Sequence, residues 1–504
     1  MKKIYTTLVF LCAVAFANGQ IVSIPDINFK LKLLSASTTN QIAKDLNGNW
    51  TVIDTNNDGL IQQSEANNIS YLDLSYISQN NPPYGDLYYN GGPTNFTGIS
   101  SFIKLNKLII GTTTVTSNLN LSNLFFLENL EIPSGTFNNV NLNNCSSLIN
   151  VKLHGFPFGN ITSPTIYNIQ LLGCTNLEIF DYRYFCTLNS FDGTDLINLT
   201  DLFLNIDNNY FSEYYSNLIS VNISNCINLK KFKAKSQKLS NINFSGLLNL
   251  EEVEISNQQV ITSVNFLSCN SLKEILANNN SFSGDFVLDN LPSLEKLFIN
   301  QLRIESITNP SNNINISISN CINLKEISSL SNQRKIQNFT ISNSYNLQKL
   351  YLSNNKISNS LNFNNFTNLT NLEIENNLIT NLNLNCPSLL ILKVQNNQLT
   401  TLDLSTCGNL QSVNCDNNNL EYVSFKNNTN ETKTFLNNPN LTYICADDME
   451  QQSVQYIVNV YELWDTCVVG DYCSFNPNGN YNTISGNALY DNETNGCDTN
   501  DAPF

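Results

Sequence analysis

The chain has 504 residues, and it carries 25 basic against 41 acidic side chains. The resulting net charge of −16 disfavours nucleic acid and anionic lipid as partners, because such binding relies on lysine and arginine neutralising phosphate. The single histidine, His154, has no nucleophile motif around it, so we expect no Ser-His-Asp, Cys-His or histidine-zinc site and no enzyme activity in this chain.

Residues 1–19 have the form of a cleaved secretory signal. Lys2 and Lys3 precede an apolar run over 8–17, and small residues follow, with cleavage plausible after Ala17 or after Gly19. The run is too short to span a membrane, and no other stretch is apolar enough to insert. We therefore expect an exported protein without membrane insertion, left with 23 basic against 41 acidic residues, a net charge of −18.

Residues 20–100 are predicted to form an N-terminal cap that begins with a short helix over 25–36. Phe29, Leu33 and Leu34 fall on one face of that helix, as an amphipathic helix requires. The cap also contains a twelve-residue loop, 54–65, which has the acidic and asparagine spacing of a calcium-binding loop with Gly59 at its sharp turn.

Calcium prefers six to eight oxygen ligands, and this loop supplies them from its first, third, fifth, seventh, ninth and twelfth positions. The predicted Ca²⁺ ligands are Asp54, Asn56, Asp58, the carbonyl of Leu60, Gln62 through a water, and Glu65. Gly48 lies close before the loop, so the incoming helix is shorter than in a calcium sensor, and a structural ion is favoured over a regulatory one. A metal-free turn rich in aspartate and asparagine remains the alternative.

Residues 101–444 repeat one short pattern, L-x-x-L-x-L-x-x-N-x-L. Leu369, Leu372, Ile374, Asn377 and Ile379 show it clearly. Fourteen copies begin at Leu105, Leu127, Leu148, Leu177, Leu199, Leu229, Leu250, Leu272, Leu294, Leu324, Leu347, Leu369, Leu389 and Leu410. This is the leucine-rich repeat pattern, and it predicts a β-rich solenoid: a horseshoe with a parallel concave β-sheet.

The second half of each repeat has two alternating apolar residues and then a thiol, three residues before the next leucine. These thiols are Cys145, Cys226, Cys269, Cys321 and Cys407. Cysteine is a small core residue, so we expect buried, reduced thiols. The consensus asparagine is expected to bond backbone groups that the turn leaves unpaired.

Most repeats are 21 to 23 residues long, but three are 29 or 30 residues. Insertions in a solenoid project on one side, so we expect surface loops around 157–164, 205–216 and 308–313. Such loops are either binding elements or tolerated insertions, since lengthening an exposed loop costs little free energy.

The concave surface can be located by strand alternation. With the fourth and sixth positions of the repeat inward, the third, fifth and seventh face the concave side. From the fifth position we predict a partner-binding set: Phe203, Lys233, Glu254, Phe298, Tyr351, Glu373 and Lys393. His154, at a seventh position, joins that face. The aromatic members are of the type that dominates binding hot spots, although they also fit a simple ladder of stacked side chains.

Residues 445–473 are predicted to form a C-terminal cap closed by a disulfide. Met449, Val454, Ile457, Val458, Tyr461 and Leu463 suggest a helix within 446–464. Cys445 with Cys467 is the preferred disulfide, with Cys473 as the alternative for one of those places. The last part, 474–504, holds an apparent strand over 481–490 and a looser calcium-like or merely acidic turn over 491–501, and we expect it to begin a further β domain that is incomplete here.

The chain resembles the secreted leucine-rich repeat surface proteins of Bacteroidota. The resemblance covers roughly 24–497 and rests on Ile24-Pro25-Asp26-x-Asn28-Phe29, on the loop 54–65, and on Tyr472-Cys473-Ser474-Phe475 followed by Asn495-Gly496-Cys497-Asp498. It implies attachment at the cell surface, with a type IX secretion sorting domain often ending such proteins. The wider comparison is to internalin-like adhesins, whose concave sheet binds a host or neighbour protein.

The sequence therefore predicts a secreted or cell-surface protein, stabilised by calcium, that binds an extracellular protein or glycan through its concave face. The rival interpretation is a structural spacer that displays a downstream domain, which is absent here and could be an enzyme.

Overall fold

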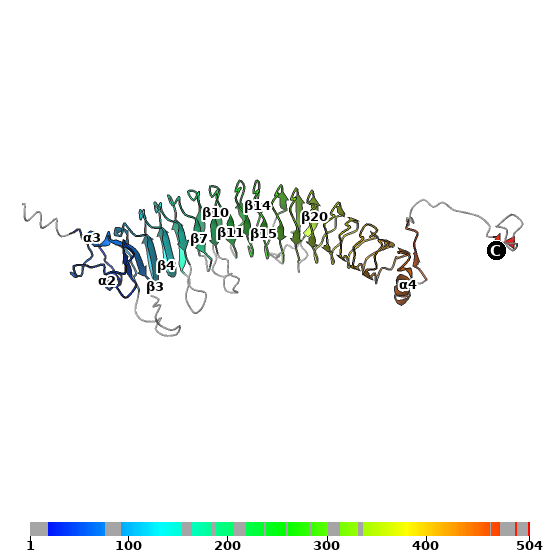
Figure 1. Ribbon diagram of the computed structural model, residues 1–504, viewed down its shortest axis with the longest axis horizontal. Coiled ribbons are helices and arrows are strands. Elements are labelled where there is room, and N and C mark those ends of the chain that lie inside the picture. The colour runs from blue at the N-terminus through cyan, green and yellow to red at the C-terminus, as the bar shows by residue number, and fades with distance from the viewer. Residues whose placement is uncertain are drawn as a thin grey trace, which may run out of the picture.

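The computed structural model describes residues 19–75, 92–153, 164–183, 187–204, 218–235, 238–258, 261–282, 284–300, 313–330, 336–463, 465–473, 489–490 and 502–503. It confirms the predicted solenoid. Figure 1 shows the strands stacked along an elongated arc, with α2 and α3 at one end and α4 at the other. Among the described residues, no helix has the length and apolar character to cross a bilayer.

One 18-stranded sheet, parallel except at its first pair, forms the inner side of the arc and continues through the end of β4 to β6 on the outer side. Its strands are β1 (Ala43–Asp45), β2 (Ile69–Leu74), β3 (Lys107–Asn120), β4 (Asn129–Asn141), β5 (Asn150–Lys152), β6 (Thr165–Gln170), β7 (Ile179–Tyr182), β9 (Asp201–Leu204), β11 (Lys231–Ala234), β13 (Glu252–Glu254), β15 (Glu274–Leu276), β17 (Lys296–Phe298), β19 (Glu326–Ser328), β21 (Lys349–Tyr351), β23 (Asn371–Glu373), β25 (Ile391–Lys393), β27 (Ser412–Asn414) and β29 (Thr432–Thr434). The long strands β3 and β4 extend beyond the inner face, and β4 pairs with β5 at its start and with β6 at its end.

The outer side of the arc carries shorter ladders of parallel strands. They are β8 (Ser190–Asp192) with β10 (Ser220–Asn222), β12 (Asn241–Asn243) with β14 (Ser263–Asn265), β16 (Phe286–Asp289) with β18 (Ile314–Ser319) and β20 (Ile336–Ser342), β22 (Leu361–Asn364) with β24 (Leu382–Asn385), and β26 (Thr401–Asp403) with β28 (Tyr422–Ser424), β30 (Tyr443–Cys445) and β31 (Val468–Gly470). Figure 1 shows β11 and β15 toward the inside of the arc and β10 and β14 toward its outside. The inner sheet is thus continuous, whereas the outer strands form separate groups.

The core lies between these two layers and is built from the repeat itself. The repeat leucines are buried, as are the predicted thiols of the outer half. Each thiol lies where a carbonyl of the preceding coil is within reach: Cys145 Sγ is 3.2 Å from the Leu121 oxygen, and Cys269 Sγ is 3.1 Å from the Phe244 oxygen. A small side chain that can also donate a weak hydrogen bond therefore fits this position.

The consensus asparagines form a buried ladder between coils. The Asn377 Nδ2 group donates to the carbonyls of Ile374, at 2.9 Å, and Leu352, at 3.0 Å. Its Oδ1 accepts from the Ile357 amide at 3.1 Å. Asn355, Asn397, Asn418 and Asn438 repeat this arrangement in their own coils. The prediction that these amides satisfy turn backbone groups is confirmed.

The N-terminal cap begins with helix α2 (Ile27–Leu34), as predicted. Asp26 caps it by accepting from the Phe29 amide at 2.9 Å, and Phe29 and Leu33 are buried. The second Asp26 oxygen accepts from Thr94 and Asn95, and these bonds hold the pKa of Asp26 below its ordinary value despite burial, which acts the other way. Helix α3 (Gln63–Ala66) and the 3-10 turn η1 (Ile99–Ser101) complete the cap.

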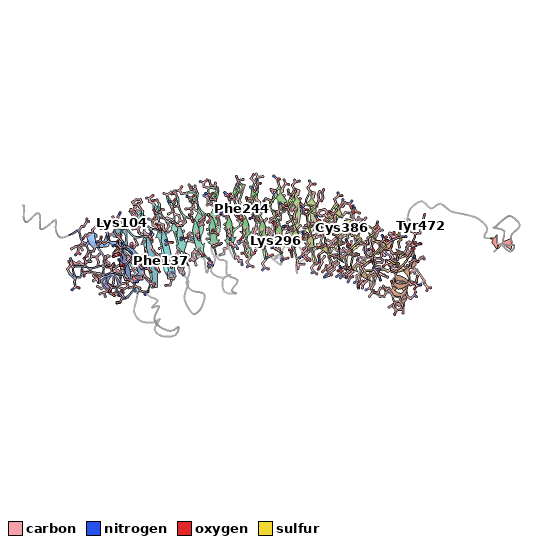
Figure 2. The ribbon with its side chains drawn as sticks, in the orientation of Figure 1. Lys104, Phe137, Phe244, Lys296, Cys386 and Tyr472 are labelled. Carbon is pink, nitrogen blue, oxygen red and sulfur yellow. A yellow bond between two sulfur atoms is a disulfide. The ribbon has the colours of Figure 1, made fainter. Side chains whose placement is uncertain are left out.

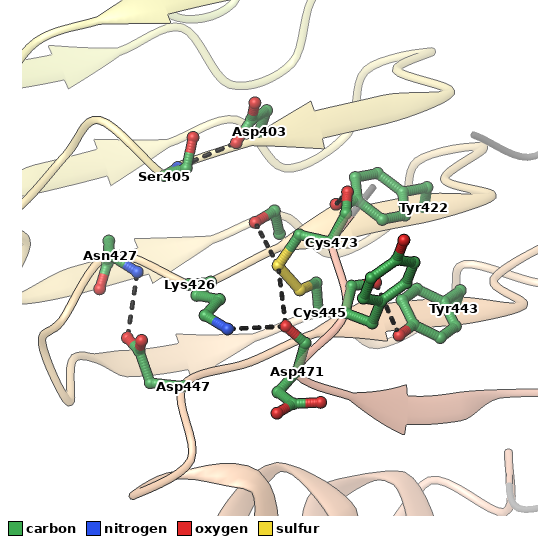
Figure 3. The surroundings of a disulfide bond; sticks show 12 residues. Asp403, Ser405, Tyr422, Lys426, Asn427, Tyr443, Cys445, Asp447, Asp471 and Cys473 are labelled. Atoms are coloured by element: carbon green, nitrogen blue, oxygen red, sulfur yellow. Dashed lines mark hydrogen bonds between the residues drawn. A yellow bond between two sulfur atoms is a disulfide. The ribbon is translucent and has the colours of Figure 1, made fainter. Parts of the chain in front are cut away.

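The C-terminal cap is closed by helix α4 (Gln451–Val460) and strand β31. Val454 and Val458 of α4 face the core, while Met449 precedes the helix and is exposed. The disulfide joins Cys445 to Cys473, so the preferred pairing with Cys467 is wrong and its alternative is right. Figure 3 shows this bond beside Tyr443 and Asp471.

Strand register explains why Cys467 is not the partner. Cys445 lies opposite Gly470 in the β30–β31 pair, three positions beyond Cys467. Cys467 precedes β31 and lies about 10 Å along the chain from Gly470, out of disulfide range, whereas Cys473 follows the strand and has its Cα 5.3 Å from that of Cys445. Cys467 is accordingly a buried free thiol, and burial raises its pKa to about 12.

Several predictions fall on residues that the structure does not describe. These are the signal segment up to residue 18, His154, nearly all of the three insertions, and most of 474–504. Within the last segment, β32 (Leu489–Tyr490) and β33 (Ala502–Pro503) pair antiparallel.

Candidate functional site: the inner face of the solenoid

The predicted partner-binding residues lie on one cross-strand ladder. From β9 to β13, Phe203, Lys233 and Glu254 are direct register partners. The ladder continues through Leu276, Phe298, Ser328, Tyr351, Glu373 and Lys393. Parallel pairing without a register shift keeps equivalent side chains of successive coils on the same face. The repeat arithmetic thus brings all seven predicted residues onto one surface.

The charged members of this ladder form ion pairs with neighbouring coils. Lys233 Nζ lies 3.3 Å from Glu252, and Glu254 lies 2.8 Å from the Lys235 Nζ. Glu373 accepts from Lys393 at 3.0 Å, and this hydrogen bond raises the pKa of Lys393. These charges therefore stabilise the sheet from coil to coil and are only partly available to a partner.

The aromatic members are half-buried rather than fully exposed. The Phe203 ring lies beneath the guanidinium carbon of Arg183, 5.6 Å from the ring centroid. Burial, with Glu373 and Glu326 nearby, raises the pKa of Tyr351, so its hydroxyl stays protonated and can donate a hydrogen bond. Within the described chain, neither Phe298 nor Tyr351 contacts another aromatic ring or a cation.

The predicted calcium loop folds as a closed turn. Asp54 accepts from the amides of Asp58 and Gly59, at 3.2 and 2.9 Å, and Asp58 accepts from the Leu60 amide at 2.8 Å. Gly59 has φ +75°, the left-handed conformation that favours glycine. Helix α3 begins directly after Gln62.

The loop has the oxygen-bearing side chains that calcium requires, but these side chains are bonded to one another and to the backbone of the loop. Both Glu65 oxygens accept bonds from within the loop, one from Thr55 at 2.8 Å and one from the Gln62 amide at 2.9 Å. Asn56 Nδ2 donates to the Asp58 carboxylate and to the side-chain oxygen of Gln62, while Asn56 Oδ1 accepts from the Asp58 amide at 3.0 Å. Throughout the described chain, no three acidic, thiol or imidazole side chains are gathered as metal ligands. Calcium binding therefore stays a prediction.

The last coil contains a buried cluster of charged side chains that the sequence analysis did not predict. Lys433 occupies the inward fourth position of β29, opposite Val413 of β27. It forms ion pairs with Glu450, which is 1% exposed, and with Glu431 at 3.5 Å. Burial, together with the neighbouring Glu431 charge, raises the pKa of Glu450 above its ordinary value. One more copy of the repeat after Leu410 puts Lys433 at a fourth position, so the spacing alone could have predicted a buried lysine.

A hollow of about 300 Å³ lies on the outer side between β6 and β8. Its polar lining is used by local turns: Asp192 accepts from Thr194, and Asp195 accepts from the Gly173 amide at 2.9 Å. These bonds explain the acidic residues there as turn-stabilising groups. The inner face remains the better candidate for recognition.

Sequence reasoning named only the fifth-position residues of the inner face. The third and seventh positions add Glu274, Asn278, Asn300 and Glu326, which are also partly exposed. The same repeat arithmetic identifies them. Their importance depends on which polar atoms are already bonded, and the spacing alone does not show this.

No protein-family profile matches the chain, and no curated protein sequence does either. Among solved structures, it is similar to the functional domain of InlJ from Listeria monocytogenes, with 18% identity and a TM-score of 0.39, over 81% of this chain and 77% of that one. It is similar to a leucine-rich repeat protein of Leptospira interrogans, with 16% identity and a TM-score of 0.37, over 81% and 97%. It is also similar to the internalin InlF of Listeria monocytogenes, with 14% identity and a TM-score of 0.34, over 90% and 96%. At these values the likeness adds nothing to the leucine-rich repeat architecture that the strand register already shows.

Proposed function

We propose that this chain is a secreted or cell-surface protein that recognises an extracellular protein or glycan through the inner sheet of its solenoid. The observation that carries the proposal is the ladder from Phe203 to Lys393, which repeats half-exposed aromatic and charged side chains on one rigid surface. Rigid surfaces with aromatic anchors recognise ligands with little loss of conformational entropy. Catalysis is not part of the proposal.

Export is proposed from the signal-like segment 1–19, and a type IX route from the resemblance alone. A disulfide such as Cys445–Cys473 persists in an oxidising compartment, which supports an extracellular location. Calcium is proposed as a structural ion of the N-terminal cap, held by the loop 54–65 after Asn56 turns its amide oxygen inward. This ion would stabilise the cap and take no part in recognition.

The test is the double variant Phe298→Ala/Tyr351→Ala, applied as labelled protein to neighbour or host cells. Attachment should weaken by roughly 1–4 kcal/mol in total, the range for aromatic hot-spot residues. Val287→Ala is the matched control, because Val287 is 57% exposed on the outer strand β16. Circular dichroism checks that all three proteins are folded. Unchanged attachment by a folded double variant would contradict the proposal.

A structural spacer for a downstream domain is the second candidate. It is favoured by the ion pairs of Lys233, Glu254, Glu373 and Lys393, which use these charges within the sheet. A spacer would lose nothing when Phe298 and Tyr351 are replaced, and shortening the solenoid by whole coils would change only the reach of the displayed domain. The same double variant therefore separates the two functions.

A further inference from the structure

The centre of the inner face carries polar groups that form no hydrogen bond or ion pair with another side chain of the described residues, or that keep one donor unbonded among them. This central patch is defined by Glu274, Asn278, Phe298, Asn300, Glu326 and Tyr351, on and directly after strands β15, β17, β19 and β21. Lys296, labelled in Figure 2, begins β17 beside it. The charged side chains of the patch differ from those on either side of it in whether they form ion pairs.

On both flanks the charges are paired. Lys231, Lys233 and Lys235 of β11 and the loop after it contact Glu252 and Glu254, and Glu373 contacts Lys393. In the patch, by contrast, Glu274 and Glu326 form no ion pair with any described residue, and neither do Lys296 and Lys349. Two acidic and two basic groups leave this area neutral on a molecule whose net charge is −16.

The two asparagines of the patch are held in one orientation. Asn278 Oδ1 accepts from the Asn300 amide at 2.7 Å. Asn300 Oδ1 accepts from the Leu330 amide and from Ser328 Oγ, both at 2.8 Å. Both oxygens are therefore fixed by the next coil, while neither Nδ2 group has an acceptor among the described residues. Neighbouring coils place these two donors about 4.8 Å apart along the solenoid.

The aromatic rings of the patch are spaced by a short side chain. Phe298, Ser328 and Tyr351 are successive register partners. The rings are thus two strand spacings apart, about 10 Å. Ser328 lies between them and is buried, so its short side chain adds little to the surface between the two half-exposed rings.

We infer that this central patch binds a neutral oligosaccharide or polysaccharide chain; the inference rests on the proposed recognition function and names its ligand. A pyranose ring has C–H faces whose slight positive charge suits the negative face of an aromatic ring. Its hydroxyls can accept from the Asn278 and Asn300 Nδ2 groups and donate to the Glu274 and Glu326 carboxylates, and the latter bonds are charge-assisted. The patch offers every one of these partners.

The charge and the backbone argue against other ligands. An acidic glycan would meet Glu274 and Glu326 as well as the two lysines of this neutral area, and the negative field of the whole molecule disfavours its approach. An extended peptide commonly adds to a free strand edge, but β17 and β19 are each hydrogen-bonded to a strand on both sides. A ligand on this face must therefore contact side chains. The patch offers hydrogen-bond donors and acceptors, and a sugar hydroxyl can bond with either.

Affinity electrophoresis tests the inference with the folded chain. The gels contain hydroxyethylcellulose, mixed-linkage β-glucan, galactomannan or dextran as neutral probes, and chondroitin sulfate as the charged one. At least one neutral probe should retard the wild type. Phe298→Ala/Tyr351→Ala should weaken that binding by about tenfold or more. Val287→Ala should leave it unchanged.

Glu274→Gln/Glu326→Gln provides a second test that preserves side-chain shape. It should also weaken binding, because a neutral amide accepts a hydroxyl proton less strongly than a carboxylate. Retardation by chondroitin sulfate alone, or by none of the neutral probes, overturns the inference. If cell attachment is nevertheless lost in the Phe298/Tyr351 variant, inner-face recognition stands and the ligand is a protein. If attachment is unchanged as well, the proposed function falls with it.

Discussion

At the scale of single residues, asparagine has three separate tasks in the solenoid. Buried asparagines such as Asn377 bond backbone groups of two coils. Others adopt positive φ at turns, for example Asn354 at +61° and Asn376 at +58°, where most other residues are strained. A third set donates to the preceding coil at the edge, as Asn228 does to the Ile197 carbonyl at 2.9 Å. These three roles explain why asparagine is so frequent in the repeats.

Replacing Asn377 by alanine should destabilise the protein. The carbonyls of Leu352 and Ile374 and the amide of Ile357 would lose their partner in the core, and each unsatisfied buried group costs about 1–3 kcal/mol. Denaturant unfolding measures the loss. Asn383→Ala is the control, since Asn383 is exposed on β24, and equal stability of the two variants would contradict the ladder's role.

The repeat thiols should resist alkylation in the native protein. Burial raises the pKa of Cys145, Cys269, Cys321 and Cys407 to about 11 and that of Cys226 to about 12, so neither thiolate nor access is available at neutral pH. Iodoacetamide labelling followed by mass spectrometry should modify them only after unfolding. Cys445 and Cys473 should be found oxidised, and disulfides among the repeat thiols would contradict the stacked core.

The predictable residues are those whose role repeats from coil to coil. Cys145 and Asn377 were identified because their spacing recurs and their chemistry suits a core position. Lys433 was not identified, and Cys473 was named only as the alternative disulfide partner, because each acts once and its partner depends on strand register or on a neighbouring coil. The pairing of Cys445 with Gly470 places Cys467 too far along the chain to form the disulfide, but this register of β31 is not evident before the fold is known.

At the scale of elements, we predict that calcium bound by the loop 54–65 stabilises the N-terminal cap. An ion bound only by the folded state stabilises it by about 2.7 kcal/mol at a hundredfold excess over the dissociation constant, expected to be on the order of 10⁻⁴ M. Calorimetric titration and melting should show this effect. Asp54→Ala/Glu65→Ala should abolish it, and Asp448→Ala, distant and exposed, should not. No heat of binding in the wild type would exclude the ion.

The last coil should make stability depend on pH. Glu450 has a pKa raised by burial, so the folded state binds its proton more tightly than the unfolded state does. The stabilisation is then fully present below the ordinary glutamate pKa of about 4.3 and is lost as pH rises through the raised value. This contribution should therefore decrease from acid to neutral pH, whereas a carboxyl group with a lowered pKa, such as Asp26, contributes in the opposite direction.

Glu450→Gln removes this titration while keeping a group that can accept from Lys433. As pH rises from acid to neutral, the melting temperature of the wild type should decrease relative to that of Glu450→Gln. The groups facing Glu450 are Lys433 and Glu431, so Glu431→Gln gives a matched comparison within the cluster. An identical pH profile for wild type and Glu450→Gln would show that another group is responsible.

At the scale of the whole molecule, the two layers differ in continuity. The inner sheet runs from β1 to β29, whereas the outer strands are grouped and β6 does not pair with β8. Hydrogen exchange should therefore show uniform protection along the inner strands, with faster exchange at outer junctions such as that between β6 and β8. Equal protection along both layers would contradict this difference.

The sequence predicted the solenoid and its inner face because stacked coils place every equivalent residue by one rule. It did not predict which inner-face charges are free, because pairing of Lys233 with Glu252, and its absence at Glu326, depends on side-chain positions across coils. The repeat spacing therefore located the inner face, and only the hydrogen bonds and ion pairs in the structure showed which part of that face is a candidate ligand site.

The disulfide between Cys445 and Cys473 also determines how the protein carries tension. Its two cysteines are 28 residues apart, and they enclose α4 and β31 in a covalent loop. A pull on the chain beyond Cys473 passes through the sulfur atoms directly to β30, so the enclosed helix and strand bear none of the load. The load therefore enters the solenoid at β30, and any peeling of strands has to begin there rather than at β31.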